Sequence, residues 1–371
     1  MNLPAHVDLV RLLLDPRQAN RGSGSVAVDR FTSPTRFAAE RAELFARVPS
    51  VVALAHEVDE PGSCVVVDVA GVSCILVRGL DGVVRAFKNA CRHRGTELVE
   101  RGCHKKAFVC RYHAWTYDLA GRLSHVPHAS AFDGREAGRD LVPVSVAVRH
   151  GFVFAALAPF DVDVHVEPVA ADLEAFGAAR STVYRESTRE VAANWKLLVD
   201  AFLDGYHIRV LHKDSVGRFF VDALFAAERA GPHVRAATAR KALLDVAADE
   251  VERRDVRELA TPSYLVFPST ILIMHPDYTS VLRIVPVAVD RTRFCHTMLV
   301  PRAPSTDAER AHFDDSFALI DGGVFAREDL AIVEAIQRGL ATGANDDVLF
   351  GDLEHPSLWF HRTVESTILR S

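Results

Sequence analysis

The sequence contains no apolar run long enough to span a membrane, which requires about 20 residues. A long uncharged stretch, residues 264–276, is interrupted by Pro268 and contains His275 near its end. The amino-terminal segment MNLPAHVDLVRLLLDPRQ carries an acidic residue inside its only apolar patch and lacks a small-residue cleavage site, unlike a signal peptide. We therefore expect a cytoplasmic protein with no membrane association.

Long basic tracts are also missing. The 43 lysine and arginine residues are outnumbered by 49 aspartate and glutamate residues, which leaves a net charge of −6. Nothing in this distribution would neutralise a phosphate backbone, so we expect no nucleic-acid partner. The apolar fraction of 49% and the charged fraction of 25% are ordinary for a folded protein. A length of 371 residues allows two or three domains.

Cysteine is scarce, with six residues in the chain. In a reducing compartment these residues are not expected to form a disulfide framework, and their spacing instead raises the question of metal binding. Cys64, Cys74 and Cys295 stand alone on strand-like segments and are predicted to be buried small hydrophobic residues. The other three lie between residues 91 and 110.

The first part of the chain is predicted to be an irregular arm and a helix, followed by a β domain. Residues 1–32 show little periodicity, and Ser33-Pro34 begins a predicted helix. We assign the arm and helix to residues 1–45 and the β domain to residues 46–160. Alternating apolar residues predict antiparallel strands in this domain at 64–68, 72–78, 83–89, 115–118 and 151–158.

The remainder, residues 161–371, is predicted to be an α+β domain. Helical segments are expected at 194–212 and 226–259, with a long helix at 305–340. The order of elements argues for a curved antiparallel sheet that grips a helix. Strands of this sheet are expected at 182–191, 263–274, 280–290 and 293–300.

Two short loops each combine a cysteine with a histidine. Cys91-Arg-His93 and Cys110-Arg-Tyr-His113 both follow strand-like segments of the β domain. Thiolate and imidazole are metal ligands, and two such pairs are much stronger evidence than one. A Cys2His2 zinc site is chemically possible, but zinc fingers place both cysteines in one knuckle. Two hairpins that bind nothing would leave the clustering of four ligands unexplained.

The loop sequences CRHRG and CRYHAWTYD resemble the paired loops of Rieske oxygenases, which hold a [2Fe–2S] cluster. The resemblance implies that Cys91 and Cys110 ligate one iron. His93 and His113 would ligate the other. Respiratory Rieske proteins carry an additional cysteine in both loops, and neither loop has one here. The Cys103-His104 pair lies between the loops but lacks their context, so we do not count it as a ligand pair.

A second group of candidate ligands lies between residues 194 and 212. His207 and His212 are five positions apart, so the helix must end or loosen there for both rings to converge. Two histidines and a carboxylate, with open positions, form the facial triad of non-haem Fe(II) oxygenases. By spacing alone, such a histidine pair is more often an ordinary surface or core pair.

The pattern N-W-K followed by D-x-Y-H-x4-H resembles the catalytic domain of ring-hydroxylating Rieske oxygenase α subunits. In that family the catalytic domain has a helix-grip, START-like fold, and an aspartate on the C-terminal helix is the third iron ligand. The resemblance therefore implies His207, His212 and Asp329 as the metal ligands. The adjacent Glu328 is the alternative carboxylate.

Asp204 has a separate role by resemblance. A family carboxylate at this position links the iron-ligand histidine, here His207, to a cluster histidine, here His113, across a subunit interface. Such a carboxylate orients both imidazoles and provides a short electron path. Because the two sites of one chain lie far apart in that fold, the link implies a head-to-tail ring, a homotrimer. The alternative for Asp204 is a surface or helix-capping aspartate.

The chain departs from the family pattern just before this carboxylate. Many members have Glu-Asn-Phe there, whereas residues 199–201 are Val-Asp-Ala in this chain. Asp200 could bind a substrate cation, orient a water molecule or cap a neighbouring group. The chain is also short for an α subunit that works with a separate β subunit, which favours a homomeric enzyme.

These patterns predict the terminal component of a Rieske oxygenase system. It would use O2 and electrons from a separate NAD(P)H-dependent reductase, with or without a ferredoxin, because no G-x-G-x-x-G motif follows a predicted strand. The reaction would be monohydroxylation, cis-dihydroxylation or oxidative demethylation of a small organic molecule. Apolar pocket walls from Phe202, Phe219, Phe220 and residues 263–300 favour a hydrophobic or aromatic substrate over a quaternary amine. The alternative function is a Rieske electron carrier whose helix-grip domain binds a ligand.

Overall fold

The computed structural model describes residues 3–15 and 22–369, which form two compact units. One unit is Phe45–His165, and the other combines Met1–Leu44 with Val166–Ser371. The structure thus groups the amino-terminal segment with the second half of the chain. None of the helices in the described residues is both long enough and apolar enough to cross a membrane.

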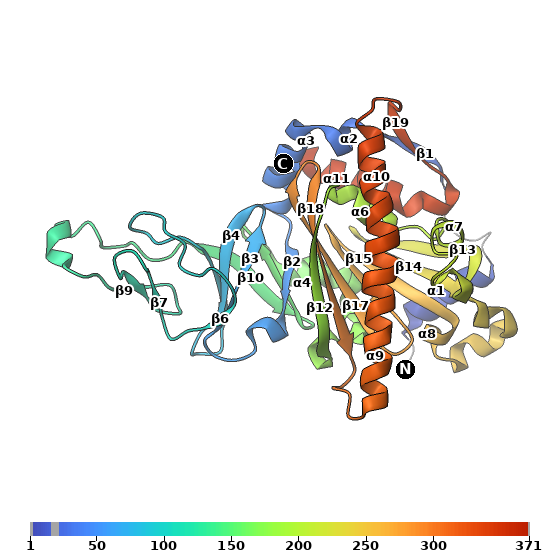
Figure 1. Ribbon diagram of the computed structural model, residues 1–371, viewed down its shortest axis with the longest axis horizontal. Helices are drawn as coiled ribbons and strands as arrows, with labels where there is room; N and C mark the ends of the chain where they lie inside the picture. Colours follow the sequence, from blue (N-terminus) through green and yellow to red (C-terminus); the bar gives the residue numbers. More distant parts are fainter. Residues whose placement is uncertain (1–2, 16–21, 370–371) are drawn as a thin grey trace. The chain divides into compact units, whose positions relative to one another are not determined.

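The unit of residues 45–165 is built from antiparallel strands (Figure 1). Seven strands form one sheet in the order β2-β11-β10-β5-β4-β3-β6, and three form a smaller sheet in the order β7-β8-β9. A buried apolar cluster between them includes Phe87, Trp115 and Tyr117 and also encloses Cys91 and Cys110. The strands are β2 (Ser50–Leu54), β3 (Ser63–Val69), β4 (Val72–Arg78), β5 (Val84–Lys88), β6 (Cys103–His104), β7 (Phe108–Val109), β8 (Thr116–Tyr117), β9 (Leu123–His125), β10 (Pro143–Arg149) and β11 (Phe152–Ala156).

The cysteines outside the paired loops differ in one respect from the expectation. Cys64, on β3, is disulfide-bonded, whereas we expected a free buried thiol there. Cys74 and Cys295 are free, and Cys74 is buried. Cys91 and Cys110 are also free, so both thiols of the paired loops are available as ligands.

The second unit contains a seven-stranded antiparallel sheet in the order β12-β18-β17-β16-β15-β14-β13 (Figure 1). The expected strands at 182–191, 280–290 and 293–300 lie in it, whereas the single strand expected at 263–274 is two antiparallel strands, β15 and β16. Successive side chains of a strand point to opposite faces of the sheet, which produces the alternating pattern of these segments. The strands are β12 (Thr182–Val191), β13 (Phe220–Ala230), β14 (His233–Arg240), β15 (Ala260–Val266), β16 (Thr270–Met274), β17 (Thr279–Ala288) and β18 (Arg291–Val300).

One face of this sheet is crossed by a long helical segment, as predicted for residues 305–340 (Figure 1). The segment consists of α9 (Asp307–Phe317), the wider turns of η10 (Ala318–Asp329) and α10 (Leu330–Leu340). Thr306 caps its start by accepting a hydrogen bond from Glu309 N at 3.1 Å, and the Glu309 carboxylate accepts one from Thr306 N at 3.3 Å. Wide π-type turns are frequent at functional sites, and η10 ends on Asp329.

The predicted helix at 226–259 is wrong. Residues 220–230 and 233–240 form β13 and β14, and only short helical turns and α8 (Val256–Leu259) follow. The predicted irregular arm at 1–32 also differs, because Pro4–Leu14 forms α1. Both differences have one cause: Val10 of α1 is fully buried in a cluster with Ala237 and Ala239 of β14. Alanine side chains leave room on the strand for a helix to pack closely.

The N-W-K segment fixes the start of α6 (Trp195–Ala201), the element that leads into the histidine pair. Asn194 caps α6 through a bond from Lys196 N to Oδ1. The Lys196 ammonium and the Trp195 indole both donate to the carboxylate of Glu40, at 2.5 and 2.8 Å. Because Glu40 and Lys196 are each only about 1% exposed, this buried pair ties the amino-terminal segment to α6.

Candidate metal centres and substrate pocket

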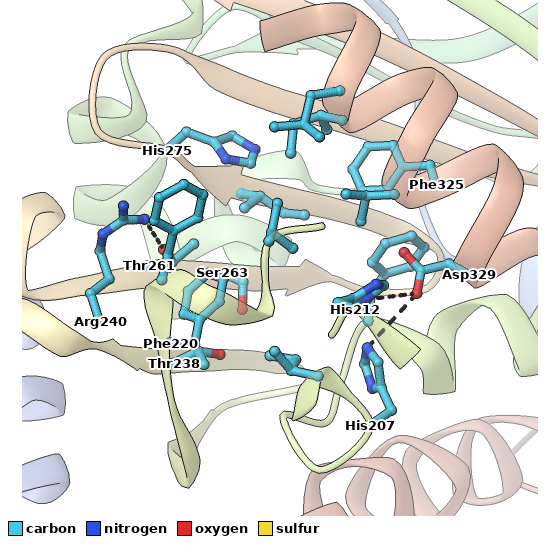
Figure 2. Close-up of a pocket in the computed structure, with 18 of the residues that line it drawn as sticks. His207, His212, Phe220, Thr238, Arg240, Thr261, Ser263, His275, Phe325 and Asp329 are labelled. Atoms are coloured by element: carbon cyan, nitrogen blue, oxygen red, sulfur yellow. Dashed lines mark hydrogen bonds and ion pairs between the residues drawn. The ribbon is translucent and has the colours of Figure 1, made fainter. Parts of the chain in front are cut away.

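The two histidines and the aspartate come from two separate segments of the second unit. His207 lies in the loop that follows α6, and His212 lies directly after α7 (Ile208–Leu211). Asp329 is the last residue of η10. The helix expected over residues 194–212 is therefore broken between α6 and α7, which is what allows both imidazoles to turn toward Asp329 (Figure 2).

One nitrogen of each imidazole and one oxygen of Asp329 lie within 4.8 Å of one another. Asp329 Oδ1 is 3.2 Å from His212 Nε2 and 3.8 Å from His207 Nε2. This oxygen is buried and accepts no hydrogen bond from the described residues. Three converging donor atoms, one of them an unsatisfied buried carboxylate oxygen, fit a metal ion with open coordination positions.

A further carboxylate is hydrogen-bonded to the other ring nitrogen of each histidine. Asp204 Oδ1 lies 2.9 Å from Nδ1 of His207, and Glu328 Oε2 lies 2.7 Å from Nδ1 of His212. Each Nδ1–H donates to its carboxylate, so the lone pair of each Nε2 is left for a metal. Glu328, the alternative ligand in the sequence, also accepts a hydrogen bond from Ser215. Its carboxylate therefore orients His212 and lies outside the converging donor set.

The same carboxylates control the protonation of both imidazoles. Burial lowers the pKa of His207, but the hydrogen bond to Asp204 and the charges of Asp204 and Asp329 outweigh it and raise the pKa. Burial likewise lowers the pKa of His212, and Asp329 and Glu328 together raise it above the ordinary value. Because these carboxylates raise the pKa of both imidazoles, protons compete with a cation for the two histidines.

A pocket lies beside these ligands. Its volume is about 960 Å³, which includes open solvent at its mouth. This is enough for a molecule with a ring and a polar group. Next to the ligands its wall is apolar and carries Phe202 and Phe325, whose ring centres are 5.5 Å apart. Phe219 and Phe220, also expected in the wall, line it as well.

Sequence reasoning missed the polar part of this pocket. Thr238 and Arg240 of β14 and Thr261 and Ser263 of β15 line it from the sheet (Figure 2). Residues two apart on a strand face the same side, so each pair shares one wall. Thr238 and Arg240 were missed because residues 226–259 were predicted to be a helix, whereas Ser263 belongs to the segment 263–300 that was expected to line the pocket.

Asp200, the departure from the family pattern, does not line the pocket. Its Oδ2 lies 3.0 Å from Nε2 of His361, on α11 (His355–Leu369). His361 is buried, and its imidazole packs against Phe31 and Phe360. Of the three roles considered for Asp200, the contact with a neighbouring group is the one that the structure contains.

The two cysteine–histidine loops have the same backbone geometry. Gly95 N donates to Cys91 O at 2.8 Å, and Ala114 N donates to Cys110 O at 2.9 Å. Both donors have a positive φ, 82° for Gly95 and 57° for Ala114. Each cysteine thus begins a tight turn closed by a left-handed residue, and the turn presents the histidine within it.

The loops bring their side chains together around unsatisfied donor atoms. The rings of His93 and His113 are 4.7 Å apart, and Nδ1 of each is buried without a hydrogen-bond partner among the described residues. Trp115 stacks on His93 at 4.9 Å, and the Tyr117 hydroxyl lies 3.4 Å from Cys91 Sγ. Two thiols and two orphaned imidazole nitrogens fit a [2Fe–2S] cluster.

The other cysteine–histidine pair has a different position. Cys103-His104 forms β6, which pairs with β3 at the edge of the seven-stranded sheet. His104 is exposed to solvent. The structure does not bring this pair into the group formed by the paired loops.

Two family models match the chain. Residues 175–369 match the model of the ring hydroxylating alpha subunit (catalytic domain). Residues 48–146 match the model of the Rieske [2Fe-2S] domain. The two matched segments contain all the candidate ligands of the second unit and of the paired loops, respectively.

Individual relatives point to the same group of proteins. The chain is 28% identical over 327 residues to the carnitine monooxygenase oxygenase subunit of Acinetobacter pittii, covering 84% of this chain and 83% of the relative. A quaternary ammonium Rieske monooxygenase in complex with L-carnitine has a TM-score of 0.80 at 22% identity, with 99% of each chain covered. Naphthalene 1,2-dioxygenase from Rhodococcus sp. has a TM-score of 0.81 at 18% identity, covering 99% of this chain and 98% of the other. These two structural likenesses establish a shared fold.

Proposed function

The chain belongs to the family of ring-hydroxylating alpha subunits, and we propose that His207, His212 and Asp329 bind its catalytic iron. It is a Rieske non-haem iron oxygenase with a [2Fe–2S] cluster and a mononuclear iron as cofactors. The observation that carries the assignment of the three ligands is the convergence of two Nε2 atoms on the unsatisfied Oδ1 of Asp329. Asp204 and Glu328 would hold the two imidazoles in the orientation that binding requires.

We further propose that Cys91 and Cys110 ligate one iron of the cluster. His93 and His113 would ligate the other through Nδ1, because those atoms are buried and have no other partner. Backbone hydrogen bonds to Cys110 support ligation by its thiolate: burial raises the pKa of this thiol, but the N–H groups of Tyr112 and His113 and the neighbouring thiol outweigh burial and lower it.

The reaction we propose is insertion of one oxygen atom into a C–H bond of a small organic substrate. An iron bound by the triad would supply the activation of O2, with electrons delivered through the cluster. The relative with the longest match described above is a monooxygenase component, which favours one inserted atom over two. Phe202 and Phe325 would hold the reacting part of the substrate beside the ligands and exclude water there.

The electrons come from a separate redox partner, a reductase or a ferredoxin, as for other terminal components of this family. We propose that the ultimate donor is NAD(P)H and that the enzyme works in the cytoplasm, where that donor is found. Asp204 would connect His207 to His113 of the partner subunit in a homotrimer. In support, only Oδ1 of Asp204 receives hydrogen bonds from the described residues of its own chain.

The experiment that tests the function is oxygenation under labelled O2. The holoenzyme, with a surrogate reductase and NADH, would be offered L-carnitine, glycine betaine, choline and a set of aromatic acids. We expect a product that contains one atom of 18O and a reaction that stops in the His212→Ala variant. The alternative, an electron carrier, would be supported by a different result. The reduced cluster would then pass electrons to an acceptor without forming labelled product, and His212→Ala would not change the rate of that transfer.

A further inference from the structure

The substrate pocket has a second end, where a positively charged side chain faces the cavity. Arg240 is the last residue of β14, and it lies across the pocket from the three iron ligands (Figure 2). Thr238 and Thr261, on the strand pair β14 and β15, lie in the same wall. A molecule that fills the pocket would therefore have one end at the metal and the other at this guanidinium.

Arg240 has no carboxylate partner among the described residues. The only hydrogen bond that its side chain makes with the described residues runs from Nη1 to Thr261 Oγ1, at 3.4 Å. The guanidinium carbon lies 5.7 Å from the ring centres of both Phe219 and Phe220. Most of the five N–H donors of this planar group are therefore left for a ligand.

Arg235, on the same strand, differs from Arg240 because it has carboxylate partners. Arg235 lies 2.6 Å from Asp172 and 3.1 Å from Glu228, so its charge is neutralised inside the protein. Arg240 is also half-buried, and burial lowers its pKa, yet a guanidinium stays charged. A partly desolvated cation without a counter-charge is costly for the protein alone, and an anionic ligand would remove that cost.

The other titratable groups at this end of the pocket do not oppose an anion. Burial, with the charges of His296, Arg257 and Arg240, lowers the pKa of His275 to about 3, so its imidazole is neutral at pH 7. Burial raises the pKa of Tyr278, and its phenol is neutral as well.

The carboxylates in the lining lie at the other end. They are Asp204 and Asp329, which belong to the iron site. The carboxylates of the lining are thus gathered at the end of the iron ligands, and Arg240 lies at the opposite end.

We propose that Arg240 binds a carboxylate of the substrate, so that the enzyme oxidises the opposite end of an organic acid. A planar guanidinium can hold a carboxylate through two parallel hydrogen bonds, and Thr238 and Thr261 could add hydroxyl donors. The aromatic wall beside the iron would accept either a phenyl ring or a methylated ammonium group. The inference rests on the proposed function, because it assigns the substrate class of the same pocket.

Binding measurements on matched ligand pairs test this proposal without turnover. Each pair would consist of a carboxylate and its neutral counterpart: 3-phenylpropionate with 3-phenylpropionamide, and glycine betaine with its amide. Dissociation constants would be measured by calorimetry on oxidised holoenzyme, for the wild type and for Arg240→Gln and Arg240→Lys. Arg218→Gln is the matched control, because Arg218 also stacks on Phe219, at 4.8 Å, but is exposed and does not line this pocket.

We expect at least one carboxylate to bind the wild type ten-fold or more tightly than its amide. Arg240→Gln should weaken that carboxylate by about 10- to 100-fold and leave the amide nearly unchanged, because it removes charge-assisted hydrogen bonds only. Arg240→Lys should lose part of the preference, since a point charge cannot pair in two places. Arg218→Gln should keep it. If 3-phenylpropionate is preferred over its amide, the substrate is an aromatic acid. If glycine betaine is preferred over its amide, the substrate is an acid with a methylated ammonium group.

The proposal is wrong if neither carboxylate binds more tightly than its amide. It is also wrong if Arg240→Gln weakens both members of a pair equally, because Arg240 would then only support the packing of Phe219 and Phe220. Should Arg240→Gln not fold, the wild-type preference and the Arg240→Lys variant still decide. A protein that lacks the mononuclear iron but keeps the preference would contradict the proposed function and leave this inference standing.

Discussion

Asp204 and His207 are joined by a hydrogen bond of 2.9 Å between Oδ1 and Nδ1. The same oxygen accepts hydrogen bonds from the backbone N–H groups of Tyr206 and His207, at 2.7 and 3.2 Å. None of the described residues donates a hydrogen bond to the second oxygen, Oδ2. One half of the carboxylate therefore holds the imidazole, and the other half is free for a group outside the chain.

We predict that Asp204→Asn separates electron transfer from metal binding. The amide keeps the size of the side chain but removes the charge that supports an imidazole N–H donor on either side. Both metal centres should stay occupied, and reoxidation of the reduced cluster by O2 and substrate should slow by about 100-fold or more. A single-turnover experiment on pre-reduced enzyme, with iron content measured in parallel, checks this. Unchanged reoxidation would remove Asp204 from the electron path and weaken the case for the trimer.

We predict that Cys110→Ala abolishes the cluster but leaves the catalytic iron in place. The wild type should be red-brown and, when reduced, give the EPR signal of a cluster with mixed histidine and cysteine ligands. The variant should lose both signals and retain about one iron per chain. Cys74→Ala is the matched control, because Cys74 is a free, buried cysteine of the same unit that lies on β4. A colourless wild type with stoichiometric zinc after anaerobic preparation would exclude the cluster.

The half-buried imidazole of His275 predicts a stability that falls in acid. Its pKa is lowered to about 3 in the folded protein, while an unfolded chain would give about 6.5. The stabilising effect is therefore complete above pH 6.5 and is lost as the pH falls from there toward 3, by up to about 1.4 kcal/mol per pH unit. In His275→Gln, which can still bond Ser280, melting temperatures at pH 7.5, 6.5 and 5.5 should decline less than in the wild type. Equal declines would show that His275 does not titrate in this way.

The sequence was most informative where chemistry is packed into short motifs. The paired loops could be recognised because each combines two ligand types within a few residues, and the structure places Cys91, His93, Cys110 and His113 together. The strands expected at 182–191, 280–290 and 293–300 were also predictable from their alternating side chains. The long helix carries a capping box at Thr306 and Glu309, which marks its start.

Long-range packing set the limits of prediction. The alanine-rich residues 226–240 favour a helix by propensity, yet Ala237 and Ala239 lie in a strand because their small side chains accommodate α1. Because these residues were predicted to be a helix, Arg240 was not recognised as a pocket residue. It faces the pocket as the last residue of strand β14. The choice between Glu328 and Asp329 likewise depends on the wide turns of η10, which direct one carboxylate to the donor set and the other to His212 Nδ1.

The central claim is tested most directly by counting iron in the wild type, in Asp329→Ala and in Glu328→Ala. A [2Fe–2S] cluster and one catalytic iron give about three irons per chain in the wild type. Asp329→Ala should fall to about two, since a site with two remaining protein ligands is too weak to keep its metal. Glu328→Ala should stay closer to three, because Glu328 only orients His212. About two irons in the wild type, or an unchanged count in Asp329→Ala, would contradict the assignment of His207, His212 and Asp329 as the catalytic iron site.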